Sequence, residues 1–425
     1  MRSIERILTL AVIVAVLGLA AAQTTLTVWM HDHPPRVPVD EELIAEFMAE
    51  NPDIQVNYEV IPVADFDLRL YTAVAAGRGP DLFNQATFAL GQFRAAGALA
   101  PLDVEAAGFG SREDFLAAYS TGAEGAVFDG TPYGIPTELS IYACYSNDEL
   151  WEAAGLSPAE DFPTTWEEMI DVAETLTVRD DDGNPVQRGF DFNWTSPIFV
   201  WLQFNPMVTQ LGGQLIDEDE FEATIDTPEV ARVMRYWSDW VNEHRLGGPQ
   251  YTGSRDAFLA GELATDCSFG NWGVPQMEDA GVDYSIHPVP RWSDAVNDNG
   301  FDKYGYYYLV NAYADEDVQE AAWKLAGFLA QHPDRYFEEA GLFQPRVEFV
   351  ESEAFQQNEI MPVFFEEMEK SFFSPRIPGF NEVADGIARA RDRVLGGAPV
   401  EETLERADSD VQGTLDRARR EAERQ

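Results

Sequence analysis

The sequence predicts an α/β fold, because its hydrophobic pattern changes between the period of about two that strands need and the period of about 3.6 that helices need. Alternating apolar residues predict strands over 26–30 and 54–60. Between them, one apolar face predicts a helix that starts at Asp40 and ends at Asn51-Pro52. Two strands joined by a crossover helix form a βαβ unit. A chain of 425 residues is long enough for roughly two to three domains.

The same pattern continues further along the chain. Residues 66–74 predict a second helix, which stops at the turn 77–80 before a strand over 81–84. Thr165 followed by Glu168 is typical of a capping box that opens a helix.

The last helix carries an apolar stripe that includes Val400, Leu404, Val411 and Leu415. The tail after it, residues 416–425, is polar and is expected to fray. No internal repeat or low-complexity tract interrupts the chain.

The N-terminus resembles an export signal. A nearly continuous apolar run from Ile7 to Ala22 follows two arginines and is shorter than the roughly 20 residues that a membrane span needs. Ala20 and Ala22 fit the small-residue cleavage rule, so residues 1–22 are expected to be removed and the mature chain to begin near Gln23. No cysteine ends the run to carry a lipid anchor, so the sequence predicts a soluble periplasmic protein.

The composition is globular but strongly acidic. The chain is 45% hydrophobic, which excludes a disordered protein, and 28 basic against 75 acidic residues give a net charge of −47. This charge repels polyphosphates and anionic lipids, so a nucleic acid partner is not expected. Lysine occurs at only three positions, a pattern that suits either a saline habitat or a biased genome. Two cysteines, Cys144 and Cys267, can pair in an exported protein or remain free and buried.

Several short segments, taken in order, resemble a known family, the extracellular solute-binding proteins of ABC importers. The resemblance is to the sugar-binding group that includes maltose-binding protein, and it covers nearly all of the mature chain. The segments are the first strand with Trp29, Gly77-Arg78-Gly79-Pro80-Asp81-Leu82, Gly97-Ala98-Leu99-Ala100-Pro101-Leu102, Gly130-Thr131-Pro132-Tyr133-Gly134-Ile135-Pro136-Thr137-Glu138, Tyr145-Ser146-Asn147-Asp148, Pro163-Thr164-Thr165-Trp166-Glu167-Glu168, Phe258-Leu259-Ala260-Gly261, Gly270-Asn271-Trp272 and Gly341-Leu342-Phe343-Gln344-Pro345-Arg346.

This resemblance implies an α/β, two-lobed periplasmic-binding-protein fold of type II, in which each lobe is a mixed sheet flanked by helices and a hinge joins the lobes. The first lobe would comprise residues 23–138 and 305–342, and the second residues 139–304 and 343–425. It also implies a monomer without a cofactor. Such a protein would hold a sugar or oligosaccharide in the cleft between its lobes and deliver it to ABC permease subunits.

Sugars offer apolar C–H faces that stack on aromatic rings and hydroxyls that pair with charged groups. The resemblance places Trp272 as a stacking platform and Glu138 as a hydroxyl acceptor, against the alternatives of a core tryptophan and a solvated hinge carboxylate. His31 and His33 follow the first strand, where family members have polar contacts. The alternatives are an idle loop and, less favoured, a metal site. Further candidates are Gln85, Thr87, Phe88, Trp194, Trp201, Phe343, Arg346 and Phe380.

At positions where maltose binders carry an aromatic residue and an acid, this chain has Gln85 and Phe88, so a ligand other than maltose is expected. Tyr306-Tyr307-Tyr308 could bind ferric iron in such a fold, but their place in a predicted strand favours packing, with Tyr306 and Tyr308 on one face. Two alternatives remain open at this point. One is the same fold with a polyamine, glycerol phosphate or iron as ligand, and the other is a secreted glycosidase with two acids in its cleft.

Overall fold

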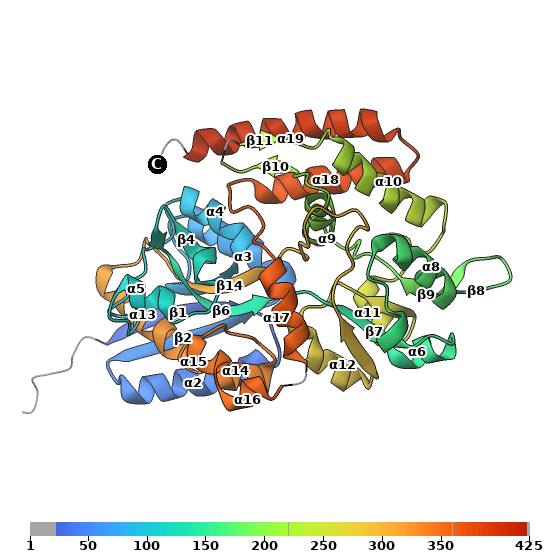
Figure 1. Ribbon diagram of the computed structural model, residues 1–425. Helices are drawn as coiled ribbons and strands as arrows, with labels where there is room; N and C mark the ends of the chain where they lie inside the picture. The colour runs from blue at the N-terminus through green and yellow to red at the C-terminus, as the bar shows by residue number, and fades with distance from the viewer. Residues whose placement is uncertain (1–22, 220, 359, 423–425) are drawn as a thin grey trace, which may run out of the picture.

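The computed structural model describes residues 23–219, 221–358 and 360–422, and it contains two five-stranded mixed sheets. The first has the strand order β2-β1-β3-β14-β6 and the second β13-β7-β12-β9-β8. Figure 1 shows the sheets side by side, with α17 between them and α18 and α19 crossing the top. No helix in the described ranges is both long and apolar enough to cross a membrane. The predicted signal segment lies outside the described residues.

In the first sheet β1 pairs in parallel with β2 and β3, and β14 runs antiparallel to β3 and β6. Helices cover both faces, because alternate residues of each strand point to opposite sides. Leu26 and Val28 pack with α2, α13 and α14, whereas Phe83 and Leu309 pack with α3 and α4. The bounds are β1 Thr24–His31, α2 Arg36–Glu50, β2 Ile54–Ile61, α3 Val63–Ala75, β3 Leu82–Ala86, α4 Thr87–Ala95, β6 Gly134–Ser140, β14 Tyr304–Val310, α13 Glu316–Leu329 and α14 Pro333–Ala340.

The second sheet is buried between two hydrophobic clusters. One contains aromatic residues of α8, α9 and α10 together with α18 and α19, and the other contains residues of α11, α12 and α17. The bounds are β7 Cys144–Asn147, α6 Asp148–Ala153, α7 Pro158–Asp161, α8 Trp166–Leu176, β8 Val178–Arg179, β9 Pro185–Phe190, α9 Pro197–Gln210, α10 Pro228–Asn242, α11 Ser254–Leu259, β12 Leu263–Asp266, α12 Val274–Ala280, β13 Tyr284–His287, α17 Met361–Lys370, α18 Phe380–Leu395 and α19 Val400–Ala422.

The chain passes between the two halves several times. β6 leads directly toward β7, the segment after β13 returns to β14, and residues 371–379 lie against α4, where a Cβ at Gly91 would come within 2.1 Å of the Arg376 carbonyl oxygen. Several short elements complete the chain. They are α5 Arg112–Ala117, η1 Ala123–Ala126, β4 Val127–Phe128, β5 Thr131–Pro132, β10 Ile216–Asp217, β11 Glu222–Ala223, η2 Asn271–Gly273, α15 Val347–Val350 and α16 Glu353–Gln356.

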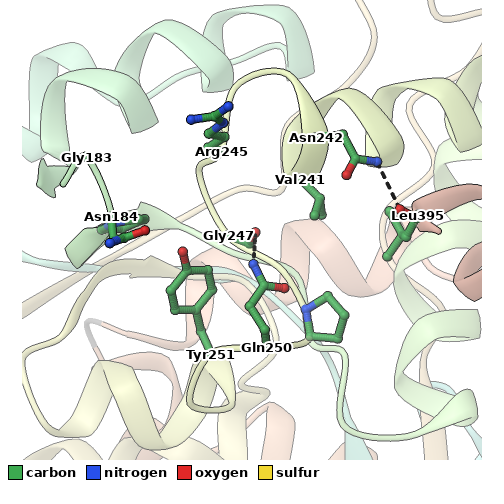
Figure 2. A pocket seen from close by; sticks show the side chains of 11 residues that line it. Gly183, Asn184, Val241, Asn242, Arg245, Gly247, Gln250, Tyr251 and Leu395 are labelled. Atoms are coloured by element: carbon green, nitrogen blue, oxygen red, sulfur yellow. Dashed lines mark hydrogen bonds between the residues drawn. The ribbon is translucent and has the colours of Figure 1, made fainter. Parts of the chain in front are cut away.

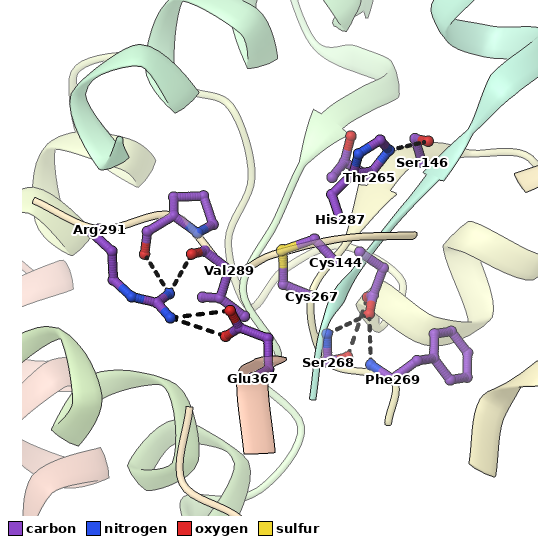
Figure 3. The surroundings of a disulfide bond; sticks show 12 residues. Cys144, Ser146, Thr265, Cys267, Ser268, Phe269, His287, Val289, Arg291 and Glu367 are labelled. Atoms are coloured by element: carbon purple, nitrogen blue, oxygen red, sulfur yellow. Dashed lines mark hydrogen bonds and ion pairs between the residues drawn. A yellow bond between two sulfur atoms is a disulfide. The ribbon is translucent and has the colours of Figure 1, made fainter. Parts of the chain in front are cut away.

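Several local predictions are confirmed. The predicted first two strands are present as β1 and β2, and Thr165 and Glu168 form a complete capping box at the start of α8. The structure joins Cys144 and Cys267 in a disulfide between β7 and the loop after β12, so of the two possibilities it shows the paired one (Figure 3).

Three predicted boundaries were wrong. The helix α2 starts at Arg36 and not at Asp40, because Asp40 is a buried helical residue that accepts a hydrogen bond from Tyr58 (2.6 Å). Strand β3 extends through Ala86, so Gln85 lies inside it. The tail does not fray at 416 but continues as α19 to Ala422, since Ala418 is buried against the core.

Candidate functional site

Three strands of the first sheet bring polar side chains to the edge that faces the second sheet. The parallel strands β1 and β3 end there, at His31 and Ala86, and Tyr306 of β14 pairs with both Ala86 and Glu138 of β6. In open α/β sheets ligands bind outside the carboxyl ends of the parallel strands. This edge is therefore the expected position of a ligand-binding site.

Arg36 and Glu138 form the charged centre of this edge. Nη1 of Arg36 lies 3.7 Å from Oε2 of Glu138, and Nε of Arg36 lies 3.3 Å from Asp40. All three side chains are buried. Burial raises the pKa of Glu138 to about 7, although the Arg36 charge opposes that rise. The Glu138 carboxyl therefore changes charge near neutral pH.

His31 is fixed as a neutral ring beside this pair. Its Nδ1 lies 2.8 Å from Nδ2 of Asn84, and its ring stacks on Tyr306 with centroids 4.1 Å apart. Burial, followed by the Arg36 charge, lowers the pKa of His31 well below its usual value. His33 turns away to the Ala340 carbonyl oxygen (3.1 Å). Within the described residues, no group of three or more His, Cys, Asp or Glu side chains could hold a metal ion.

A row of aromatic rings leads from His31 to the second sheet. Tyr306 and Tyr304 have centroids 5.9 Å apart, and Tyr304 and Tyr142 have centroids 6.2 Å apart. Tyr142 lies between β6 and β7, where the chain crosses from one sheet to the other. The rings of Tyr304 and Tyr306 are partly exposed, whereas that of Tyr142 is buried between the two halves.

Arg255 lies at the far end of this row, inside a set of rings. Its guanidinium carbon is 4.2 Å from the centroid of Phe199, 4.7 Å from that of Trp272 and 5.5 Å from that of Phe269. Nε of Arg255 donates to the carbonyl oxygen of Ser268 (2.9 Å), and Nη2 donates to the same oxygen.

The loop that carries Trp272 is held by the crossing segment and by a buried acid. Oδ1 of Asn271 accepts from the backbone N–H of Ile141 (2.9 Å), and the Tyr145 hydroxyl donates to the Gly270 carbonyl oxygen (2.9 Å). Asp266 accepts from the backbone N–H groups of Ser268 and Phe269, next to the disulfide (Figure 3). The Trp272 ring is thereby fixed at the junction between the two sheets. There it packs partly against a hydrophobic cluster of the first sheet and one of the second.

Several buried polar atoms around this junction have no hydrogen-bond partner among the described residues. Buried polar groups are normally paired, so such atoms mark positions where a polar ligand can bind. They include Nη1 of Arg36, Oε2 of Glu138, the hydroxyl of Tyr142 and Nε1 of Trp272.

The structure brings together only part of the predicted site. Glu138, His31 and Trp272 lie at the junction, and Phe88 contacts Phe380 across it with centroids 6.4 Å apart. The side chains of Gln85 and Thr87 are buried, with Gln85 bonded to Asp67 and Thr87 to the Gly305 backbone. The side chains of the remaining predicted residues are held by contacts within the protein: Phe343 in an aromatic cluster, Arg346 over Phe109 and Tyr119, Trp194 with its Nε1 on Asp191, Trp201 with its Nε1 on Asp302, and His33 on Ala340.

Arg36, Tyr142, Tyr304 and Arg255 were not predicted from the sequence. An arginine in the first turn of a helix, four residues before an acid, is a weak signal for Arg36, but nothing local distinguishes Arg255 from other surface arginines. For the three consecutive tyrosines, Tyr307 and Tyr308 pack in clusters on opposite faces of the sheet, as expected for a strand. Tyr306 instead belongs to the site.

The second half carries a separate pocket of about 460 Å³, lined by Gly183, Arg245 and Tyr251 among others (Figure 2). Its amide side chains are bonded to the protein, with Gln250 donating to Gly247 and Asn242 donating to Leu395. Among its described lining residues, this pocket has none of the unpartnered buried atoms found at the junction.

Two α/β lobes with unpartnered polar atoms and aromatic rings between them define a two-lobed ligand-binding protein. The chain belongs to the bacterial extracellular solute-binding protein family, whose model matches residues 34–335. It is therefore a binding protein and not an enzyme.

The relatives agree with this assignment. The maltotriose-binding protein of Pyrococcus abyssi (strain GE5 / Orsay) is 23% identical over 374 residues, covering 87% of this chain and 77% of the relative. A solute-binding protein from Thermotoga lettingae bound to α-D-tagatose superimposes with a TM-score of 0.78 at 22% identity, covering 92% of this chain and 100% of the other. A maltose/maltodextrin-binding domain from Bdellovibrio bacteriovorus bound to maltotriose gives 0.76 at 21% identity, covering 93% and 100%. At these identities the solved structures establish the fold.

Proposed function

We propose that this protein captures a sugar or oligosaccharide between its lobes and delivers it to the permease subunits of an ABC importer. The observation that carries the proposal is the buried pair of Arg36 and Glu138, whose facing atoms lack hydrogen-bond partners among the described residues and lie beside the stacked rings of His31 and Tyr306. A guanidinium donates and a carboxylate accepts, so the pair matches a hydroxyl group that does both.

The relatives support a carbohydrate as the ligand. Their ligands range from a monosaccharide, tagatose, to maltotriose, so the fold accommodates sugars of different length. The partly exposed rings of Tyr304 and Tyr306 offer apolar surface on which a sugar ring can stack. Trp272 at the far end of the aromatic row is the proposed platform, and Glu138 is the proposed hydroxyl acceptor.

The proposed lobes are residues 23–138 with 305–342, and residues 139–304 with 343–425. Each contains one of the two sheets, apart from the strand ends at the junction. Closure of the lobes over the sugar would produce the shape that the permease recognises. We also propose that the protein is a monomer and that it is exported to the periplasm with removal of residues 1–22. Mass spectrometry of protein from the native organism tests that last step, since an intact Met1 would contradict it.

A thermal-shift screen of the mature protein tests the ligand class. A ligand that binds only the folded state, at 100 times its Kd, adds about 2.7 kcal/mol to the free energy of unfolding. The screen should contain mono- and oligosaccharides with polyamines and glycerol phosphates as controls. We expect the melting temperature to rise with sugars. A rise with polyamines or glycerol phosphates alone would overturn the proposal.

A further inference from the structure

We infer that the ligand presents a carboxylate to Arg255, so that the sugar is a sugar acid such as a uronate. The inference deepens the proposed function and rests on it. The observations that carry it are that Arg255 has no ion pair among the described residues and that the polar groups around it are mainly hydrogen-bond donors.

Arg255 is partly exposed at this junction and has no carboxylate partner within 4.0 Å among the described residues. By contrast, Arg36, Arg188 and Arg291 each have a buried carboxylate within that distance. Closure of the lobes over Arg255 would remove its guanidinium from water, at a desolvation cost that an anionic ligand would offset. The Arg255 charge is therefore available to an anionic ligand.

The nearby acid does not supply the missing partner. Burial raises the pKa of the Asp266 carboxyl, and the Arg255 charge lowers it by a smaller amount. Its Oδ1 is already bonded to the backbone N–H groups of Ser268 (2.6 Å) and Phe269 (3.1 Å). Asp266 thus shapes the loop, and it forms no ion pair within 4.0 Å with the guanidinium.

The surroundings of Arg255 also leave donors unused. A guanidinium has five N–H groups, and those on Nε and Nη2 that bond to Ser268 share a single carbonyl oxygen. The Arg255 charge lowers the pKa of the buried Tyr142 hydroxyl, against the larger raising effect of burial, so the two groups are close. That hydroxyl lies close enough to interact with Arg255 and Tyr304 but forms no well-aligned hydrogen bond with them, and Nε1 of Trp272 has no partner among the described residues. Arg255 and Nε1 of Trp272 can only donate.

This end of the junction therefore suits an acceptor without hydrogens of its own. A carboxylate accepts through two oxygens and matches the planar fork of an arginine. The other end, with Glu138 and Arg36, contains both an acceptor and a donor and suits hydroxyls. A molecule with hydroxyls at one end and a carboxylate at the other is a sugar acid.

Calorimetric titration of the mature protein at fixed ionic strength tests the inference. The probes are D-galacturonate, D-glucuronate and digalacturonate, the neutral sugars galactose and glucose, the methyl ester of galacturonate, and glucose 6-phosphate. We expect at least one uronate to bind about tenfold or more tightly than its neutral counterpart, and the methyl ester to lose that advantage. The ester comparison needs no variant and therefore does not depend on any variant's folding.

Arg255→Gln should bring the ratio of uronate to neutral-sugar affinity close to one. Arg78→Gln is the matched control, because it removes the same charge from an exposed turn at the opposite end of β3 and should leave the ratio unchanged. Tight binding of neutral sugars with no preference for uronates would overturn the inference and leave the proposed function intact. A preference for glucose 6-phosphate would assign the site to a phosphate and overturn the carboxylate. Failure of every sugar to bind would count against both proposals.

Discussion

Nη1 of Arg36 lies 3.7 Å from Oε2 of Glu138, yet neither atom forms a hydrogen bond with the described residues. Both side chains are buried, and Arg36 also forms an ion pair with Asp40. This arrangement holds a carboxyl whose pKa is about 7 at the junction of the two lobes. Its protonation state therefore bears directly on ligand binding near neutral pH.

Glu138→Gln should weaken sugar binding by about 1–2 kcal/mol, because a neutral amide replaces a charge-assisted acceptor. For a neutral sugar, affinity of the parent should rise between about pH 6 and 8, since the carboxylate accepts better than the protonated acid. The Glu138→Gln variant should lose this pH dependence. Calorimetry at several pH values measures both effects, with the exposed Glu50→Gln as control. Equal affinities of the parent and the Glu138→Gln variant at pH 8 would remove Glu138 from the site.

Trp272→Ala should reduce affinity by about 1–3 kcal/mol, roughly a 5- to 150-fold rise in Kd. Arg255 covers one face of the indole, so the loss reports on the rest of the ring surface. Trp29→Ala makes the same truncation beside α3, away from the junction, and should leave Kd unchanged. Circular dichroism checks folding. If Trp272→Ala binds as tightly as the parent, Trp272 is not the platform.

Because of Asp302, the free energy of unfolding should decrease as the pH rises from about 4 to 7. Asp302 is fully buried, it accepts from Trp201 (2.9 Å) and Ser374 (2.7 Å), and burial raises its pKa to about 7. The folded state then holds a proton that the unfolded state has released, so stability decreases across this window and is lowest above the folded-state pKa. The full shift corresponds to a free energy on the order of 4 kcal/mol.

Asp302→Asn removes this proton, so the stability of the variant relative to the parent should increase from pH 5 to pH 8. Urea denaturation at both pH values measures the difference, and Asp53→Asn, an exposed change, serves as control. A constant difference between the Asp302→Asn variant and the parent would mean that Asp302 does not titrate in this range.

Reduction of the Cys144–Cys267 disulfide should lower the free energy of unfolding by about 2–5 kcal/mol. The bond closes a loop with a sequence separation of 123, and long loops gain most from closure because the unfolded chain loses the most entropy. Melting curves with and without a reducing agent test this. The double variant Cys144→Ser/Cys267→Ser should have a melting temperature close to that of the reduced parent. The reducing agent should not change it. A parent that is equally insensitive would contradict the prediction.

Sodium chloride should raise the melting temperature. The excess acidic side chains, which give a net charge of −47, repel one another. Salt screens this repulsion, because it shortens the Debye length from about 30 Å at 0.01 M to about 3 Å at 1 M. Sucrose at matched osmolality separates screening from solvent exclusion. A flat or falling melting temperature in salt would show that the acidic side chains are already balanced or too dispersed to matter.

The local elements and the class of fold could be predicted from the amino-acid pattern. Alternation in β1 and β2, and the capping box at Thr165, depend on neighbours within a few residues, so they were visible in the sequence. The family resemblance likewise located Glu138 and Trp272, because both belong to short recognisable segments.

Which side chains meet could be learned only from the three-dimensional packing. Arg36 reaches Glu138 because β1 and β6 belong to one sheet with β14 between β3 and β6, and Arg255 reaches Tyr142 because α11 and the crossing segment share one junction. The same packing buried Phe343 and Gln85, which the sequence had offered as contacts. Charge pairing, burial and the pKa of Glu138 depend on residues far apart in the chain, and local periodicity carries no information about such distances.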